Sequence, residues 1–235
     1  MSISDSDRPR FRLLIREWPA LALRAWRSVG SLEPRGPDDG PPLIVIPGFL
    51  ANDRTTLGLQ RALAAAGYRV AGWGLGLNRG VSEDVLDRLA ERVESFAGRR
   101  PALLVGWSLG GVYARELAKV RPDLVDKVVT MGSPFSGDLR SNNVWRLYEW
   151  VAGHPVDDPP IKTVLGEKPP VPTLAIWSRR DGIISVASAR GAEAESDCRV
   201  ELDCSHMGFA VSGRAFPSIV ATIKKFQGHG APDRR

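Results

Sequence analysis

Short apolar runs alternate with amphipathic stretches along the central part of the chain. The runs at 43–46 and 102–105 contain no polar residue. Strands buried on both faces show such continuous apolar runs, and helices between them cover a parallel sheet on its two sides. The pattern therefore predicts an α/β fold, in which a mostly parallel twisted sheet has helices on both faces. The expected strands are 43–46, 68–73, 102–107, 127–131, 173–177 and 199–202.

The stretches between these strands predict helices, because their apolar residues recur at helical spacing. Helices are expected at 54–66, 109–119 and 214–227, and another begins after Ser82. Short polar side chains accept hydrogen bonds from the first turn of a helix. On this basis Asp53 is the expected N-cap of the first helix and Ser82 the expected N-cap of the second.

Three segments depart from the alternation. Residues 1–42 contain an amphipathic helical segment at 10–29, followed by a linker rich in Gly, Pro and Asp. Residues 134–170 are rich in proline and aromatic residues, and are too long for a simple connection. They predict a short cap inserted into a main domain that spans 43–227. The polar residues 228–235 predict a disordered tail.

The segment at 10–29 has an apolar stripe and an arginine-rich opposite side. We favour packing of this stripe on the protein's own body. Two alternatives stay open: a peripheral contact with a membrane surface, for which an arginine-rich helix is suited, and a contact in a dimer. The sequence does not fix the oligomeric state.

Composition narrows the class of protein. Hydrophobic residues make up 43% of the chain and charged residues 25%, as in soluble globular domains. The formal net charge is +5, but the arginines are scattered and no nucleic-acid motif occurs, so no nucleic-acid partner is expected. The N-terminus lacks the pattern of a signal peptide, and no apolar run is long enough to span a bilayer, which favours a cytoplasmic location.

The cysteines and histidines give no sign of a metal site. Cys198 and Cys204 stand at the two ends of a predicted strand. Extended chain of that length separates them by about 20 Å, too far for a disulfide. We therefore expect two free thiols, and the spacing of Cys and His fits no metal-binding pattern.

The strongest chemical signal is the sequence Gly106-Trp107-Ser108-Leu109-Gly110. It lies between a predicted strand and a predicted helix, which is the setting that a G-x-S-x-G nucleophile motif requires. Small neighbours allow a sharp turn there, and the start of the following helix favours developing negative charge. Ser108 is therefore the predicted nucleophile.

A serine hydroxyl needs a base that takes its proton. His206 follows the last predicted strand, whereas His154 lies in the predicted cap and His229 in the tail. Polar residues at the carboxyl ends of strands in an open parallel sheet meet at one site. We therefore predict His206 as the base and Asp181, which follows the preceding strand, as the acid that orients it. Asp203 is nearer in sequence but is interpreted as a turn carboxylate.

Acyl chemistry at Ser108 also requires two donors for an oxyanion. We predict the backbone N–H of Leu109 and that of Phe49, which lies in the loop after the first strand. Four aromatic residues are candidate contacts for a hydrophobic substrate, although those in the cap are explained equally well by packing. They are Trp107, Trp145, Tyr148 and Trp150.

Four segments, in this order, resemble the α/β-hydrolase superfamily and within it the compact bacterial lipases and esterases. They are Ile46-Pro47-Gly48-Phe49, Gly132-Ser133-Pro134-Phe135, the stretch from Ser178 to Ile184, and Ser205-His206-Met207-Gly208. The histidine that usually precedes the first glycine is Pro47 here. The resemblance implies a carboxylic ester hydrolase that forms an acyl-enzyme without metal or cofactor, acting on a small-molecule or lipid ester.

Two other functions stay open at this point. An acyltransferase or thioesterase would use the same three residues. A non-catalytic ligand-binding protein would have the same fold, since fold alone does not decide function. Neither the acyl chain nor the alcohol of a substrate can be inferred from the sequence.

Overall fold

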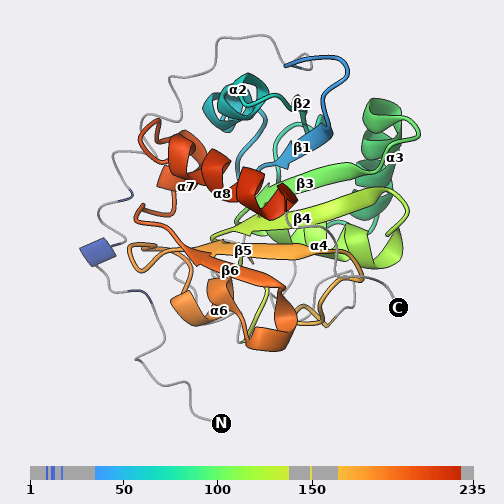
Figure 1. Cartoon of the computed structure of the whole chain (residues 1–235). Helices are drawn as coiled ribbons and strands as arrows, with labels where there is room; N and C mark the ends of the chain where they lie inside the picture. The colour runs from blue at the N-terminus through green and yellow to red at the C-terminus, as the bar shows by residue number, and fades with distance from the viewer. Residues whose placement is uncertain are drawn as a thin grey trace.

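A computed structural model of the chain describes residues 35–137 and 164–228, together with Pro9, Arg12, Leu13, Glu17 and Glu149. Six strands form one sheet in the order β2-β1-β3-β4-β5-β6, and all neighbouring strands are parallel (Figure 1). Their bounds are β1 Pro42–Ile46, β2 Arg69–Gly72, β3 Ala102–Trp107, β4 Val125–Met131, β5 Thr173–Trp177 and β6 Cys198–Glu201.

Helices connect the strands and follow the last of them. They are α2 Leu57–Ala65, α3 Val85–Ala97, α4 Leu109–Val120, α6 Val186–Arg190, the short 3₁₀ helix η2 Glu193–Glu195, α7 Gly208–Val211 and α8 Phe216–Gly228. In Figure 1, α8 lies across one face of the sheet, and α4 lies behind the strands.

Alternation of side chains along each strand builds a core on both faces of the sheet. In β1, the side chains of Leu43 and Val45 point to one face, where they belong to a cluster with residues of α2, α7 and α8. Those of Ile44 and Ile46 point to the other face and join a cluster with residues of α3 and α4. Because both faces are buried, the strand has to be apolar throughout.

The strand order reverses between β1 and β3. From β1 the chain moves outward to β2, and then returns to place β3 on the other side of β1. In open α/β sheets the crevice at such a switch point, beyond the carboxyl ends of the strands, is where ligands bind. Here that point is bordered by the loop after Ile46 and by the turn at Ser108.

The predicted fold class is confirmed, and each expected strand is present within two residues of its predicted bounds. The two predicted caps are wrong. Asp53 does not cap α2, because its carboxylate accepts hydrogen bonds from the N–H groups of Trp73 and Gly74, at 2.9 and 3.0 Å. Ser82 does not cap α3 either, since its hydroxyl donates to the Asp84 carboxylate.

Several predictions fall outside the described residues. They are most of the helix expected at 10–29, most of the cap with Trp145, Tyr148, Trp150 and His154, and the tail with His229. Within the described part of the chain, no helix has the length and apolar character needed to cross a membrane. Cys198 and Cys204 are both free.

Candidate active site

Ser108 occupies a strained turn between β3 and α4. Its backbone has φ 55° and ψ −125°, a conformation that side-chain-bearing residues rarely adopt. Two hydrogen bonds fix the turn: the Ser108 N–H donates to the Met131 carbonyl at 2.9 Å, and the Gly111 N–H donates to the Ser108 carbonyl at 3.0 Å. Strain of this kind persists only where surrounding structure enforces it, and it is frequent at active sites.

The glycines around Ser108 are required by contact distances. A Cβ at Gly106 would lie 2.3 Å from the Gly110 carbonyl oxygen, and one at Gly110 would lie 2.3 Å from the Ile46 carbonyl oxygen. A Cβ at Gly111 would lie 2.0 Å from Ser133 Oγ. Any side chain at these positions would push α4 away from the sheet. The glycines therefore allow the close approach of helix and strand that the predicted motif needs.

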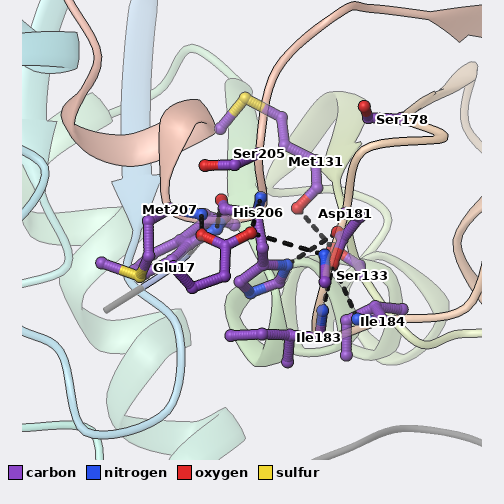
Figure 2. Close-up of polar contacts among 12 residues, drawn as sticks. Glu17, Met131, Ser133, Ser178, Asp181, Ile183, Ile184, Ser205, His206 and Met207 are labelled. Carbon is purple, nitrogen blue, oxygen red and sulfur yellow. Dashed lines mark hydrogen bonds and ion pairs between the residues drawn. The ribbon is translucent and has the colours of Figure 1, made fainter. Parts of the chain in front are cut away.

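Asp181 and His206 meet across neighbouring loops, after β5 and β6. His206 Nδ1 lies 2.8 Å from Asp181 Oδ2 (Figure 2). The N–H groups of Ile183 and Ile184 donate to the other carboxylate oxygen at 2.8 and 2.7 Å. Because an ionised carboxylate only accepts, Nδ1 carries the hydrogen and Nε2 is the basic nitrogen of the neutral ring.

Burial and charge act on His206 in opposite directions. Burial by itself lowers the pKa of this imidazole, because it disfavours the charged form. The negative charge and hydrogen bond of Asp181, together with the charge of Glu17, outweigh burial and raise the pKa above its ordinary value. The site therefore favours an imidazolium, the form that a base acquires when it takes a proton.

Gly132 lies directly against this pair. Its φ is 55°, and a Cβ there would lie 2.9 Å from Asp181 Oδ2 and 3.2 Å from His206 Nδ1. The residue after β4 therefore has to be glycine if the carboxylate and imidazole are to keep their contact. In the sequence, Gly132 stands out only through the resemblance of its segment to the corresponding segment of lipases.

Trp107 supports the loop that carries His206. Its indole N–H donates to the His206 carbonyl at 3.0 Å, and the two rings lie 5.4 Å apart at their centroids. The side chain is 2% exposed. These contacts assign Trp107 a part in holding the base loop, while its predicted contact with substrate stays a prediction.

The loop after β1 approaches Ser108 from the other side. A Cβ at Gly48 would lie 2.9 Å from Ser108 Cβ, so only glycine permits this approach. Phe49 follows Gly48, and Leu109 is the first residue of α4. The N–H groups in the first turn of a helix have no partner within that helix. The two predicted oxyanion donors thus belong to the segments on either side of Ser108.

A buried amide that the sequence analysis missed braces this loop. Asn78 Nδ2 donates to the Pro47 carbonyl at 2.9 Å, and Asn78 Oδ1 accepts from the Tyr113 hydroxyl at 3.2 Å. The Leu50 N–H donates to the Asn78 carbonyl, and the Asn78 N–H donates to the Ala51 carbonyl. A lone Asn in a polar stretch gives no sequence signal for such a role.

Glu17 is a second residue that the sequence analysis did not single out. Its side chain is fully buried and points at the backbone of the base loop (Figure 2). Oε1 accepts from the His206 N–H at 2.7 Å, and Oε2 accepts from the Met207 N–H at 3.0 Å. Oε1 also accepts from the Gly182 N–H, next to Asp181, at 3.4 Å.

The sequence matches no protein-family model and no curated protein. Solved structures do match. An α/β-hydrolase enzyme, MGS-MChE2, from the metagenome of lagoon sediments at Mar Chica, Morocco, superposes with a TM-score of 0.60 at 21% identity, over 83% of this chain and 94% of that one. This chain has the α/β-hydrolase fold.

Other α/β-hydrolase-like structures agree over comparable lengths. The carboxylesterase CesB from Bacillus subtilis matches with a TM-score of 0.58 at 14% identity, covering 93% of this chain and 99% of that one. The thioesterase domain from the curacin biosynthetic pathway matches with a TM-score of 0.58 at 16% identity, covering 82% and 93%. Identities this low establish the shared fold, and activity has to be argued from the site.

Proposed function

We propose that this chain is a serine hydrolase that cleaves carboxylic esters, with Ser108 as nucleophile, His206 as base and Asp181 as the acid that orients His206. The observation that carries the proposal is the φ of 55° at Ser108 in the turn between a buried strand and a helix. A strained serine in this setting is the nucleophile elbow of α/β-hydrolases. The 2.8 Å contact between Asp181 and His206, beyond the ends of β5 and β6, supports it further.

In the proposed acylation step, Ser108 Oγ forms a bond to the ester carbonyl carbon while His206 Nε2 takes the hydroxyl proton. The imidazolium is stabilised by the Asp181 carboxylate at Nδ1. Collapse of the tetrahedral intermediate breaks the bond to the alcohol oxygen, and His206 returns the proton to that oxygen. Water then attacks the acyl-enzyme by the same route and releases the acid. These steps use only side chains, backbone and water.

The oxyanion of each intermediate is proposed to accept hydrogen bonds from the N–H groups of Phe49 and Leu109. The close approach of Gly48 to Ser108 supports this pairing, because it brings the loop after β1 next to the start of α4. Removal of one such donor typically slows an enzyme of this type by 10² to 10³-fold, roughly.

A thioesterase is the second candidate, favoured by the likeness to the curacin thioesterase domain. The same triad would attack a thioester carbonyl, and the leaving group would be a thiol instead of an alcohol. The acyl chain would be unchanged. A matched pair of oxygen and sulfur esters with the same acyl group therefore separates the two functions.

A fluorophosphonate tests the proposal without a guess about substrate, because it bonds to an activated serine. We expect one adduct by intact mass on the wild type and none on Ser108→Ala. Ser82→Ala, which changes an exposed serine before α3, serves as the matched control and should label like the wild type. A folded wild-type protein that takes up no adduct would contradict the proposal and favour a non-catalytic ligand-binding protein.

A further inference from the structure

Glu17 is a fully buried carboxylate whose hydrogen bonds join two loops. Its three partners are backbone N–H groups. Those of His206 and Met207 belong to the loop after β6, the base loop, and that of Gly182 belongs to the loop after β5 that carries Asp181, the acid loop. The first of these belongs to the residue that carries the candidate base. Glu17 thus contacts both loops of the site from a segment 189 residues away in sequence.

Burial of a carboxylate at this position is unfavourable in free energy. An ionised group taken out of water needs strong hydrogen bonds or an opposite charge. Among the described residues, no Lys or Arg forms an ion pair with Glu17, so the N–H groups compensate its charge. An apolar side chain would fill the same volume without this cost, which suggests a role beyond packing.

We propose that Glu17 is a positioning residue of the active site: it clamps the base loop to the acid loop and places a second negative charge beside His206. This inference rests on the proposed hydrolase function of the same site. The burial of its carboxylate against both loops holds Glu17 itself on the domain.

The negative charge of Glu17 changes the protonation equilibrium of His206 in one direction. Among the described residues, two carboxylates act on His206 from the elements around it: Asp181 after β5 and Glu17 from the N-terminal segment. The Cys204 thiol lies in the same loop as His206. Burial first, and then the charge of Asp181, raise the pKa of Cys204 to about 12, so this thiol stays neutral. Asp203 is paired with Arg180 at the exposed side of the loop, at 2.7 Å. The charges of Asp181 and Glu17 therefore both favour the imidazolium of His206.

The test compares two conservative variants by their fluorophosphonate labelling rate as a function of pH. Glu17→Gln keeps the size of the side chain but loses the charge and one acceptor oxygen. Glu17→Asp keeps the charge but is one methylene too short to reach both loops. Glu91→Gln, at an exposed position of α3, is the matched control. Thermal melting confirms that each variant is folded.

In Glu17→Gln we expect the acid limb of the pH profile to move to lower pH, because His206 loses a neighbouring negative charge and its pKa falls. The plateau rate should fall on the order of tenfold, because the base loop is no longer held in its position. In Glu17→Asp the plateau should fall while the acid limb stays near its wild-type position. A folded Glu17→Gln protein with a wild-type pH profile would overturn the proposal. A lower plateau rate with the acid limb at its wild-type pH would also overturn it, because the role of Glu17 would then be structural only.

An NMR titration of His206 separates this inference from the proposed function. The resonance is identified by its loss in His206→Gln, and its pKa should be lower in Glu17→Gln than in the wild type and Glu91→Gln. If the wild type takes up no fluorophosphonate, the hydrolase proposal fails while this titration still decides whether Glu17 acts on His206.

An unchanged titration would overturn the proposal for Glu17. If Glu17→Gln does not fold, the labelling plateau of Glu17→Asp decides, and an unchanged plateau would overturn it.

Discussion

Two non-glycine residues in the described ranges have positive φ angles, and both lie next to the candidate site. Ser108 has φ 55°, and Leu50, in the loop after β1, has φ 54°. Each such position costs about 1 to 3 kcal/mol and persists only where the surrounding structure enforces it. The hydrogen bond from the Leu50 N–H to the Asn78 carbonyl and that from the Ser108 N–H to the Met131 carbonyl supply this constraint. The two strained residues lie at the switch point of the sheet, which is where the fold enforces an unfavourable backbone conformation.

Gly132→Ala tests how closely the site is packed around Asp181 and His206. The new Cβ would lie 2.9 Å from Asp181 Oδ2, so the carboxylate has to move. We expect a loss of about 1 to 2 kcal/mol in the free energy of unfolding from the backbone conformation, and a fall in labelling rate on the order of 100-fold from the displaced base. Urea denaturation and fluorophosphonate kinetics measure the two effects.

Gly137→Ala is the matched control for this prediction. Gly137 has φ 70°, and a Cβ there would have no atom of the described residues within 4 Å beyond its chain neighbours. This variant should lose a similar amount of stability and keep its labelling rate. Equal labelling rates in the two variants would show that Gly132 matters only for its backbone angle.

At the scale of elements, the strands could be predicted because burial on both faces leaves a plain signal. All residues of β1, β3 and β5 are buried, and apart from Thr173 at the start of β5 and the tryptophan indoles, their sequences contain no polar side chain. The strand-to-helix turn at Ser108 could be placed for the same reason. The pairing of Asp181 with His206 followed from topology, since residues after neighbouring parallel strands meet at one edge.

The contacts that were not predicted from the sequence are made by polar side chains to residues that are far away in sequence. Asp53 looks like a helix cap, yet it bonds to the backbone after β2, because α2 begins four residues later at Leu57. Asn78 and Glu17 occupy ordinary polar positions in sequence. Only the folded chain shows that one braces the loop after β1 and the other joins the loops after β5 and β6.

Asn78→Ala tests the brace of the loop after β1. The change leaves the Pro47 carbonyl and the Tyr113 hydroxyl without their Asn78 partner. Loss of such buried partners costs about 1 to 3 kcal/mol. We also expect a labelling rate lower by roughly tenfold, because the loop that carries the Phe49 N–H is no longer held in place. Measurement of both quantities in Tyr113→Phe gives the control, since this variant keeps the bond between Asn78 and Pro47. An Asn78→Ala protein that labels like the wild type would argue against a brace.

For the whole molecule, the protonation of one buried residue is linked to folding. His206 is titratable in both states, and its pKa is raised in the folded state by the charges of Asp181 and Glu17 despite burial. In the unfolded chain a histidine titrates at about pH 6.5. Between that value and the raised folded pKa, the native state binds more protons than the unfolded state, so its free energy of unfolding falls as pH rises.

The stabilisation that His206 contributes is therefore complete below about pH 6.5 and is lost as pH rises through the folded pKa. His206→Gln removes this linkage and leaves the other titrating groups in place. We expect the difference in free energy of unfolding between wild type and His206→Gln to be larger at pH 6 than at pH 9, in favour of the wild type, when both are unfolded in urea. The opposite sign would mean that burial outweighs the two carboxylates, and the acid limb of the labelling profile would then lie below the ordinary pKa of histidine. The folded-state pKa of His206 determines both the pH dependence of the free energy of unfolding and the acid limb of the labelling profile. The two measurements therefore have to report a shift of this pKa in the same direction.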